Sequence, residues 1–419
     1  MKTSESINIR SITLGLDHKL LGDPGLIEKL KYFNIVATQE FTAVTDYIRT
    51  KRICLTPINN QDGSLSQDRT ASIISKMQDL IDNLDMRWGC VPVDLVDLIY
   101  TPDAKKTVID ILKKHDNIFI NLLNTKDSKI SIKGAKFAAE IIKQNSKLSK
   151  TGFDNFRLGV AASCGPNIPF FPFSYHKGGE PGFSIAIEIL PFLLHKLKSC
   201  KESSIKEQTN YLINESIPFI KNLDDIAFKI EKLTGISYEG MDISLAPFPK
   251  QYAIGDILEK FGIDNIGSHG TTYVTSVLTD LLRDIIDRSG IKAIGFNGVM
   301  YSLLEDDQLA SSNNKLNYSI DTLSLLSTVC GCGLDMIPIP GDTLSDEIAS
   351  LILDISSLSI NLKKPLGVRL LPIPEKTSGM MTEFNYDFLV NTRIMAVKND
   401  CFESFKFTDD DQIYRKLRF

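Results

Sequence analysis

The sequence predicts an α/β fold with a large and mostly parallel sheet. Short apolar runs rich in β-branched residues recur along the 419 residues, and segments with helical periodicity separate them. Several of these runs are apolar on both faces, as expected for strands that crossover helices cover on both sides. Strand and helix alternate about ten times, which is typical of α/β architecture.

The expected strands follow one another along the whole chain. In order they are residues 7–14, 52–56, 86–91, 118–123, 156–162, 185–190, 241–245, 293–296, 334–337, 367–371 and 393–397. The stretch 158–175 carries no charge and approaches the length of a membrane span, but Pro166, Pro169 and Pro172 would break a helix there. We therefore expect a buried strand that continues into a loop.

The expected helices lie between these strands. They are residues 70–83, 132–146, 204–234, 273–289 and 344–359. The first of them places Ile73, Ile74 and Met77 on one apolar stripe. In the third, Pro218 should kink or split the helix, because proline removes a backbone hydrogen bond.

No internal repeat and no Gly/Ser-rich or Pro-rich linker divides the chain. We expect residues 1–398 to form a single α/β domain and residues 399–419 to form a C-terminal tail. The tail combines charged and aromatic residues, and we expect it to pack on a neighbouring surface.

The composition is that of a globular protein. Basic residues number 47 and acidic residues 52, for a net charge of −5, and 43% of the residues are apolar. These proportions exclude a disordered or collagen-like chain, and the absence of a basic stripe predicts no nucleic-acid partner. Seven scattered cysteines form no disulfide framework, and the first residues lack the apolar core of a secretory signal. We therefore expect a cytoplasmic protein without a membrane partner.

Two segments place glycine, proline and reactive side chains just beyond a buried strand, where parallel α/β folds bind ligands. Residues 164–180 carry Asn167 and His176 on a loop that lines a pocket or, alternatively, is a rigid loop whose His176 satisfies a backbone carbonyl. In residues 242–249, Asp242 and Ser244 share one face of a strand, which is either the inner face of a barrel or a solvated edge.

A third segment, residues 267–272, leads directly into a helix. The helix N-terminus with Gly270, Thr271 and Thr272 would hold a carboxylate or phosphate, and His269 would serve as an acid or base. The alternative is an ordinary helix cap.

A fourth segment, residues 328–340, places glycines around a cysteine and precedes Asp335. Cys330 would present a thiol to a cavity or, alternatively, is a small buried hydrophobic residue. His176 and His269 with a nearby carboxylate (Glu180, Asp242 or Asp335) would suit a single divalent metal, although no two of them have ligand spacing. The usual phosphate-binding and hydrolase signatures are absent, and the sequence leaves the cofactor unknown.

These segments together resemble the uncharacterised protein family 0210, also called domain of unknown function 711. The resemblance runs from about residue 7 to about residue 397 and is carried by residues 8–15, 51–58, 242–249, 267–272 and 333–343. It implies an α/β barrel of the pyruvate formate-lyase and ribonucleotide reductase type, with about ten strands and a site inside. In glycyl radical enzymes of that fold a loop cysteine carries the radical, but this chain has no C-terminal glycyl radical motif, so that mechanism is not expected.

The resemblance also carries a set of candidate residues. They are Asn167, Pro169, His176 and Gly178, then Asp242, Ser244, Pro247 and Pro249, then His269, Gly270, Thr271 and Thr272, and finally Cys330, Gly333 and Asp335. We expect an enzyme acting on a small anionic metabolite inside the barrel. His176, His269, Cys330 and Asp242 would be catalytic, and Asn167, Ser244, Asp335 and residues 270–272 would bind substrate.

Two alternatives remain open from the sequence: a non-catalytic protein that binds or senses a metabolite, and a metal-dependent hydrolase. General base rates for proteins of this kind also favour a homo-oligomer, most often a two-fold dimer.

Overall fold

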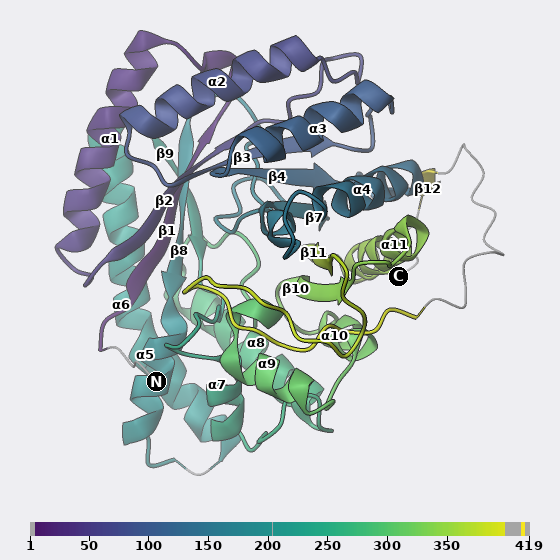
Figure 1. Cartoon of the computed structure of the whole chain (residues 1–419). Helices are drawn as coiled ribbons and strands as arrows, with labels where there is room; N and C mark the ends of the chain where they lie inside the picture. Colours follow the sequence, from purple (N-terminus) through teal and green to yellow (C-terminus); the bar gives the residue numbers. More distant parts are fainter. Residues whose placement is uncertain (1–4, 203, 399–411, 415–419) are drawn as a thin grey trace.

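The computed structural model describes residues 5–202, 204–398 and 412–414 (Figure 1). Its strands are β1 (Asn8–Leu16), β2 (Ile48–Leu55), β3 (Trp88–Asp94), β4 (Ile118–Leu123), β5 (Thr125–Lys126), β6 (Lys129–Ser131), β7 (Leu158–Ala162), β8 (Gly182–Glu188), β9 (Ser237–Asp242), β10 (Gly333–Pro340), β11 (Leu366–Ile373) and β12 (Gln412–Tyr414).

The α-helices are α1 (Pro24–Thr42), α2 (Gln67–Asn83), α3 (Pro102–Lys114), α4 (Ile132–Asn145), α5 (Ile189–Ser199), α6 (Ile205–Thr234), α7 (Ile254–Lys260), α8 (Thr271–Ser289), α9 (Asp307–Asn314), α10 (Ile320–Leu326) and α11 (Ser345–Leu362). Short 3-10 helices are η1 (His18–Leu20), η2 (Phe153–Arg157) and η3 (Leu303–Glu305). No described helix combines the length and apolar character that crossing a bilayer requires.

A large mixed sheet organises the described residues. Nine strands lie in the order β10-β11-β7-β4-β3-β2-β1-β8-β9. Most neighbours are parallel, and the two antiparallel pairs are β1 with β8 and β7 with β11. The expected α/β fold is therefore confirmed, and the sheet is mixed instead of uniformly parallel.

Residues 293–302 run beside both edges of this sheet. Ala293 bridges Met241 of β9 in the parallel sense, and Ser302 bridges Asp335 of β10 in the same sense. The segment forms isolated bridges and no continuous ladder. Gly295 and Asn297 have φ values of +95° and +47°, in the left-handed region, which interrupts an extended strand.

The two faces of the sheet differ in chemistry. On β1, Leu14 faces the helices, and its antiparallel partner Phe183 packs on Phe33 of α1 with ring centroids 4.9 Å apart. Figure 1 shows α1 to α4, α6 and α11 arranged around this helix face. Ser11 and Gly15 alternate with the apolar residues of β1 and point to the opposite face, called here the loop face.

The connection between β7 and β8, residues 163–181, covers the loop face. Ser11 Oγ donates a hydrogen bond to the Pro169 carbonyl at 2.9 Å, and Asn121 Nδ2 donates to the Ser174 carbonyl at 3.2 Å. This connection is close to the strands, because a Cβ on Gly15 would lie 2.6 Å from His176 Nδ1. The expected buried strand that continues into a loop is confirmed by β7 and this connection.

Most expected elements correspond to elements of the structure, with shifted ends. Residues 293–296 and 393–397, expected as strands, form only isolated bridges, so those two expectations are wrong. Of the expected kink or split of the long helix, the split is wrong, because α6 continues through Pro218 with buried residues on both sides, Ser216 and Ile220. Tertiary packing of that buried face outweighs the one hydrogen bond that proline removes.

The expected tail lies mostly outside the described residues, namely at 399–411 and 415–419. Between these parts, β12 pairs antiparallel with β6 of the same chain, with Gln412 opposite Ser131. The segment before the tail, residues 374–398, crosses the front of the molecule in yellow in Figure 1.

Candidate functional site

A cavity of about 130 Å³ lies on the loop face of the sheet. Its charged lining residues are Arg10, Arg49, Arg52, Arg87, Arg369, Glu305 and Asp335, and its aromatic ones are Trp88, Phe119, Phe156, Phe170, Phe171, Phe173, Phe248 and Phe388. Five guanidinium groups converge on one small space, where charged groups are otherwise rarely buried.

Several strands deliver the arginines to this space. Arg10 stands on β1 where the register with β8 shifts between Ile9 and Ser11, and such a bulge re-aims side chains. Arg52 lies on β2 opposite Thr13 of β1, and Arg87 directly precedes β3. Neighbouring strands therefore place three guanidinium groups on the same side of the cavity.

Two of the five arginines are neutralised by carboxylates. Arg49 pairs with the buried Glu188, which also accepts a hydrogen bond from Tyr47. Arg369 forms a two-point contact with Asp335, from Nε to Oδ1 at 2.7 Å and from Nη2 to Oδ2 at 3.0 Å. Such two-point contacts fix the orientation of both groups.

The other three arginines form no ion pair with any described carboxylate. Arg52 is the deepest of them, with 7% of its surface exposed, whereas Arg10 is half-buried and Arg87 is exposed. Arg52 donates from Nε to Thr50 Oγ1 at 2.9 Å and from Nη1 to the Pro169 carbonyl at 3.4 Å. Its direct hydrogen bonds therefore go to neutral oxygens only, and the negative charge of Glu305 acts on it without an ion pair.

Burial, together with the charge of Arg10, lowers the pKa of Arg52 to about 9. Arg52 stays charged at neutral pH, but keeping that charge in the folded protein costs free energy. A bound anion would offset this cost, because it would supply the missing opposite charge at the arginines.

Trp88 marks the same side of the cavity. The guanidinium carbons of Arg52 and Arg87 lie 5.0 and 4.5 Å from its ring, within cation–π range. Two cations that share one ring repel each other, and an anion between them would relieve the repulsion. Trp88 is also the single tryptophan of the sequence, so its fluorescence reports on this site alone.

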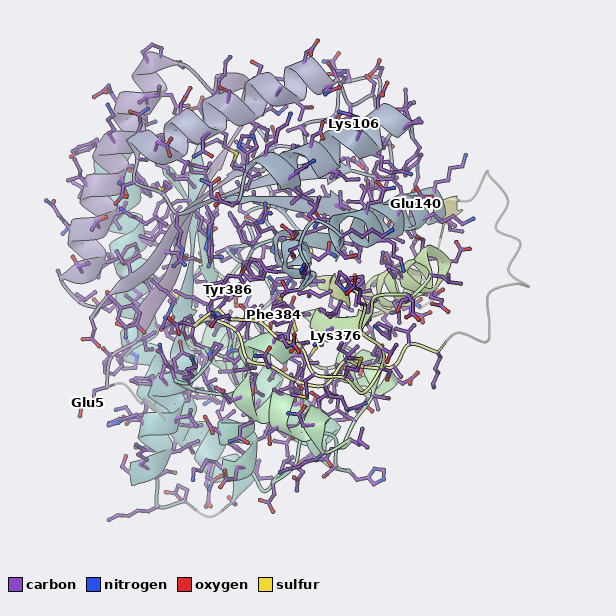
Figure 2. All side chains as sticks on the ribbon, in the orientation of Figure 1. Glu5, Lys106, Glu140, Lys376, Phe384 and Tyr386 are labelled. Atoms are coloured by element: carbon purple, nitrogen blue, oxygen red, sulfur yellow. The ribbon has the colours of Figure 1, made fainter. Side chains whose placement is uncertain are left out.

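The segment 374–398 contributes Phe388 to the lining. The ring of Phe388 lies 5.5 Å from that of Phe156, and Tyr386 stacks on Phe153 with centroids 4.1 Å apart. Figure 2 shows Tyr386 and Phe384 near each other on this segment. Aromatic contacts thus hold the segment against the cavity.

Of the residues predicted from the sequence, Asp335 and Pro247 line this cavity, and Asp335 is the one with a titratable side chain. Burial raises its pKa, although the charge of Arg369 opposes the shift, and nearby Glu305 raises it further. Asp335 is therefore easier to protonate than an ordinary aspartate.

Asp242 and Ser244 do not line this cavity, and their side chains accept hydrogen bonds from backbone N–H groups. Asp242 Oδ1 accepts from Ser244 Oγ at 2.6 Å, and Oδ2 accepts from the Phe296 N–H at 2.7 Å. Ser244 Oγ in turn accepts from the Gly298 N–H at 3.2 Å. The pair fixes the irregular segment 293–302 beside β9.

His176 and Asn167 contact each other away from the arginine cavity, and His176 lines a separate cleft. His176 Nδ1 lies 2.9 Å from Asn167 Oδ1, and His176 is fully buried at the edge of a cleft that also includes Lys126 and Tyr175. Burial lowers the pKa of His176 and so favours the neutral ring. This pair is well formed but does not line the arginine cavity.

The loop at 267–272 lines a third cleft, at the start of α8. His269 is exposed, and Thr271 Oγ1 donates to the Ser268 carbonyl of its own turn at 2.7 Å. Gly270, with φ +99°, supplies the left-handed backbone before the helix, and Thr272 also lines this cleft. The structure does not bring these residues to the arginine cavity.

Cys330 is buried beside Cys332, and neither lines the cavity. A hydrogen bond from the Cys332 thiol lowers the pKa of Cys330 to about 6. His176 and His269 lie in different clefts, and no three His, Cys, Asp or Glu side chains of the described residues gather as metal ligands would.

The sequence reasoning missed the arginines and Glu305. Arg369 stands inside a strand that is otherwise apolar, and Arg10 and Arg52 each stand beside buried apolar residues of β1 and β2. An arginine in a buried strand is costly unless something balances it, so this pattern was the available signal.

Comparison with known proteins gives a consistent picture. A family model described as "Uncharacterised ACR (DUF711)" matches residues 1–387. A UPF0210 protein of Neisseria meningitidis serogroup C is 26% identical, over 97% of this chain and 94% of the relative. UPF0210 proteins of Clostridium perfringens and Pyrobaculum aerophilum are 27% and 29% identical, over 92% and 62% of this chain and 89% and 58% of their own lengths.

Proposed function

This chain belongs to the DUF711 family, and from its own residues we propose that it is an enzyme acting on a small anionic metabolite in the arginine-lined cavity. The observation that carries the proposal is Arg52, a buried guanidinium without a carboxylate partner among the described residues. Natural proteins retain such a cost mainly where it serves binding or catalysis.

The size and chemistry of the cavity narrow the ligand. Arginine forks match carboxylate and phosphate groups, which they hold by two parallel hydrogen bonds. The volume of about 130 Å³ is close to the ~150 Å³ of an engineered cavity that accepts benzene. The metabolite is therefore a compact carboxylate or phosphate, with an apolar part against the aromatic walls.

We place this cavity inside a ten-membered α/β barrel of the pyruvate formate-lyase type, formed by residues 1–398 as one domain. Residues 293–302 would be the tenth member, and their parallel bridges to β9 and β10 support closure. The barrel would consist of two parallel halves, β1-β2-β3-β4-β7 and β8-β9-(293–302)-β10-β11, that meet at the two antiparallel pairs.

Within this cavity, Asp335 is the candidate for proton transfer. It lines the cavity, and burial raises its pKa above that of an ordinary aspartate, which makes its carboxylate a stronger base. The catalytic role predicted for four other residues stays a prediction, and no one site brings them together. They are His176, His269, Cys330 and Asp242. A non-catalytic metabolite-binding protein is the second candidate, because the cavity has many groups that bind an anion and few that titrate.

Fluorescence of Trp88 tests anion binding. Measured relative to their quenching of N-acetyltryptophanamide, iodide should quench it several-fold more strongly than caesium, and inorganic phosphate or benzoate should protect against iodide, because the arginines concentrate anions at the ring. Arg52→Met should remove most of the difference, whereas the exposed Arg283→Met on α8 should not. Equal quenching by iodide and caesium would overturn the proposal.

Turnover separates the two candidate functions. The wild-type protein and Arg52→Met are incubated with a pool of small organic and phosphorylated acids, and the pool is followed by mass spectrometry. Loss of one compound with wild type but not with Arg52→Met supports the enzyme. Binding in the fluorescence assay without any turnover supports the binding protein.

A further inference from the structure

The charges around the cavity are divided between two sides. Arg10, Arg52 and Arg87, from β1, β2 and the residue before β3, face it without carboxylate partners among the described residues. The two carboxylates that line the cavity, Asp335 and Glu305, come from β10 and η3. In the sheet order, β11, β7 and β4 separate β10 from β3, so the two groups approach the cavity from different directions.

The acidic side contains one guanidinium for two carboxylates. Arg369 Nη2 donates to Glu305 Oε2 at 3.2 Å and to Asp335 Oδ2 at 3.0 Å. Ser302 Oγ also donates to Glu305 Oε2. Arg369 is therefore the ion-pair partner of both carboxylates among the described residues, and the charge of Glu305 also acts on Arg52 across the cavity.

Glu305 has an oxygen left for a ligand. Both hydrogen bonds of its side chain to described residues use Oε2, and its Oε1 has none. The Glu305 side chain is 20% exposed, and the residue lines the cavity. Two donors bind Oε2 and thereby fix the orientation of the carboxylate. Oε1 is therefore a preorganised hydrogen-bond acceptor.

We propose that the metabolite carries a hydrogen-bond donor, an ammonium or hydroxyl group, opposite its anionic group, and that Glu305 binds this donor. The inference rests on the proposed function, since it divides the same cavity into an anion side and a donor side. A purely anionic ligand would meet the arginines but would offer no hydrogen-bond donor to Glu305 Oε1.

Three four-carbon compounds test the division. Succinate has two carboxylates and no donor, L-aspartate has two carboxylates and an ammonium group, and 4-aminobutanoate has one of each. Trp88 fluorescence titrations should rank aspartate about tenfold tighter than succinate, the effect of one charge-assisted hydrogen bond. The single carboxylate of 4-aminobutanoate should make it weaker than aspartate.

The variant Glu305→Gln identifies the residue responsible. It keeps the size of the side chain and removes its charge, so the preference for aspartate over succinate should fall to about twofold or less while succinate affinity stays the same or rises. Glu140→Gln on α4, labelled in Figure 2, is the control and should retain the tenfold preference. Equal thermal midpoints of the two variants show that folding is intact.

The outcomes of these experiments distinguish failure of this inference from failure of the proposed function. Equal binding of aspartate and succinate, or an unchanged preference in Glu305→Gln, overturns the donor side and leaves the anion site standing. Failure of all three compounds at millimolar concentration overturns the inference. It overturns the proposed function as well only if iodide also shows no preference over caesium.

Discussion

Arg52 and Arg157 are both buried arginines, with 7% and 5% of their surfaces exposed, but their surroundings differ. Arg157 donates to the Leu112 carbonyl at 2.8 Å, to the carbonyls of His115 and Ile118, and to Asp154 at 3.3 Å. Arg52 donates hydrogen bonds to one hydroxyl, at 2.9 Å, and to one carbonyl, at 3.4 Å. Burial alone therefore does not mark a site, whereas burial without compensation does.

We infer that Arg157 has a structural role and that Arg52 has a role in binding, although both are buried arginines. Arg157 ties the end of α3 to β4 and to η2, and its partners lie within its own region of the chain. Arg52 faces a cavity that it shares with four other arginines. We expect the two residues to respond in opposite ways to the same substitution.

Arg157→Met should have the largest effect. The Leu112, His115 and Ile118 carbonyls would lose their donor, and we expect the free energy of unfolding to fall by about 3 kcal/mol. Urea denaturation measures this loss. The exposed Arg283→Met should change stability by less than about 0.5 kcal/mol. A similarly small loss in Arg157→Met would contradict its structural role.

Arg52→Met should change stability in the other direction. Removing an uncompensated buried charge while keeping an apolar stem of similar length should raise the free energy of unfolding of the ligand-free protein by about 1 kcal/mol. The stabilisation by added phosphate that we expect for wild type should be absent from Arg52→Met in the same denaturation experiment. A loss comparable to that of Arg157→Met would place Arg52 among the structural residues.

Glu188→Gln probes a compensated arginine of the cavity, Arg49. Burial opposes ionisation of Glu188, but the hydrogen bond and charge of Arg49 outweigh it and lower the pKa of Glu188 below the ordinary 4.5. The unfolded chain then takes up a proton at higher pH than the folded protein does, so stability from this group is present above pH 4.5 and falls as the pH falls.

We therefore expect Glu188→Gln to lose about 1–2 kcal/mol at neutral pH and to approach wild type as the pH drops below about 4.5. Thermal unfolding scans across pH measure the convergence. Glu140→Gln should follow wild type across the same range, because its carboxylate is partly exposed. Parallel curves for wild type and Glu188→Gln would rule out the ion pair as the source of the stability.

His269→Ala should have the smallest effect. The side chain is exposed in a cleft apart from the arginines, so we expect less than about 0.5 kcal/mol in stability and unchanged anion affinity. Trp88 titration with phosphate measures the affinity. A clear loss of affinity would bring the loop at 267–272 back into the binding site.

The sequence predicted the local part of this fold well. Residues 118–123 form a strand with the expected bounds, and 273–289 lie within α8. Asp335 was a candidate because the family resemblance carries it, and it lies near the start of a buried strand that the apolar pattern predicted. Periodicity and glycine placement are properties of neighbouring residues, so they can be read from the chain directly.

The antiparallel pairing of β1 with β8 and the irregular path of 293–302 could not be read in this way. Both depend on contacts between distant segments, such as Asp242 with the Phe296 N–H, 54 positions apart. The same limit applies to the site. His176 and His269 look alike as reactive residues beside glycines, yet the fold places one inside and the other at the surface.

By itself, the sequence determined an α/β protein of the DUF711 family with strands, helices and reactive loops at the stated positions. Only the tertiary structure decided which charges are balanced. Arg49 meets Glu188 across 139 positions and Arg369 meets Glu305 across 64, while Arg52 meets no described carboxylate. Charge balance in a folded protein is set by distances in space, and the arginine that is left without a partner shows where an anion is expected.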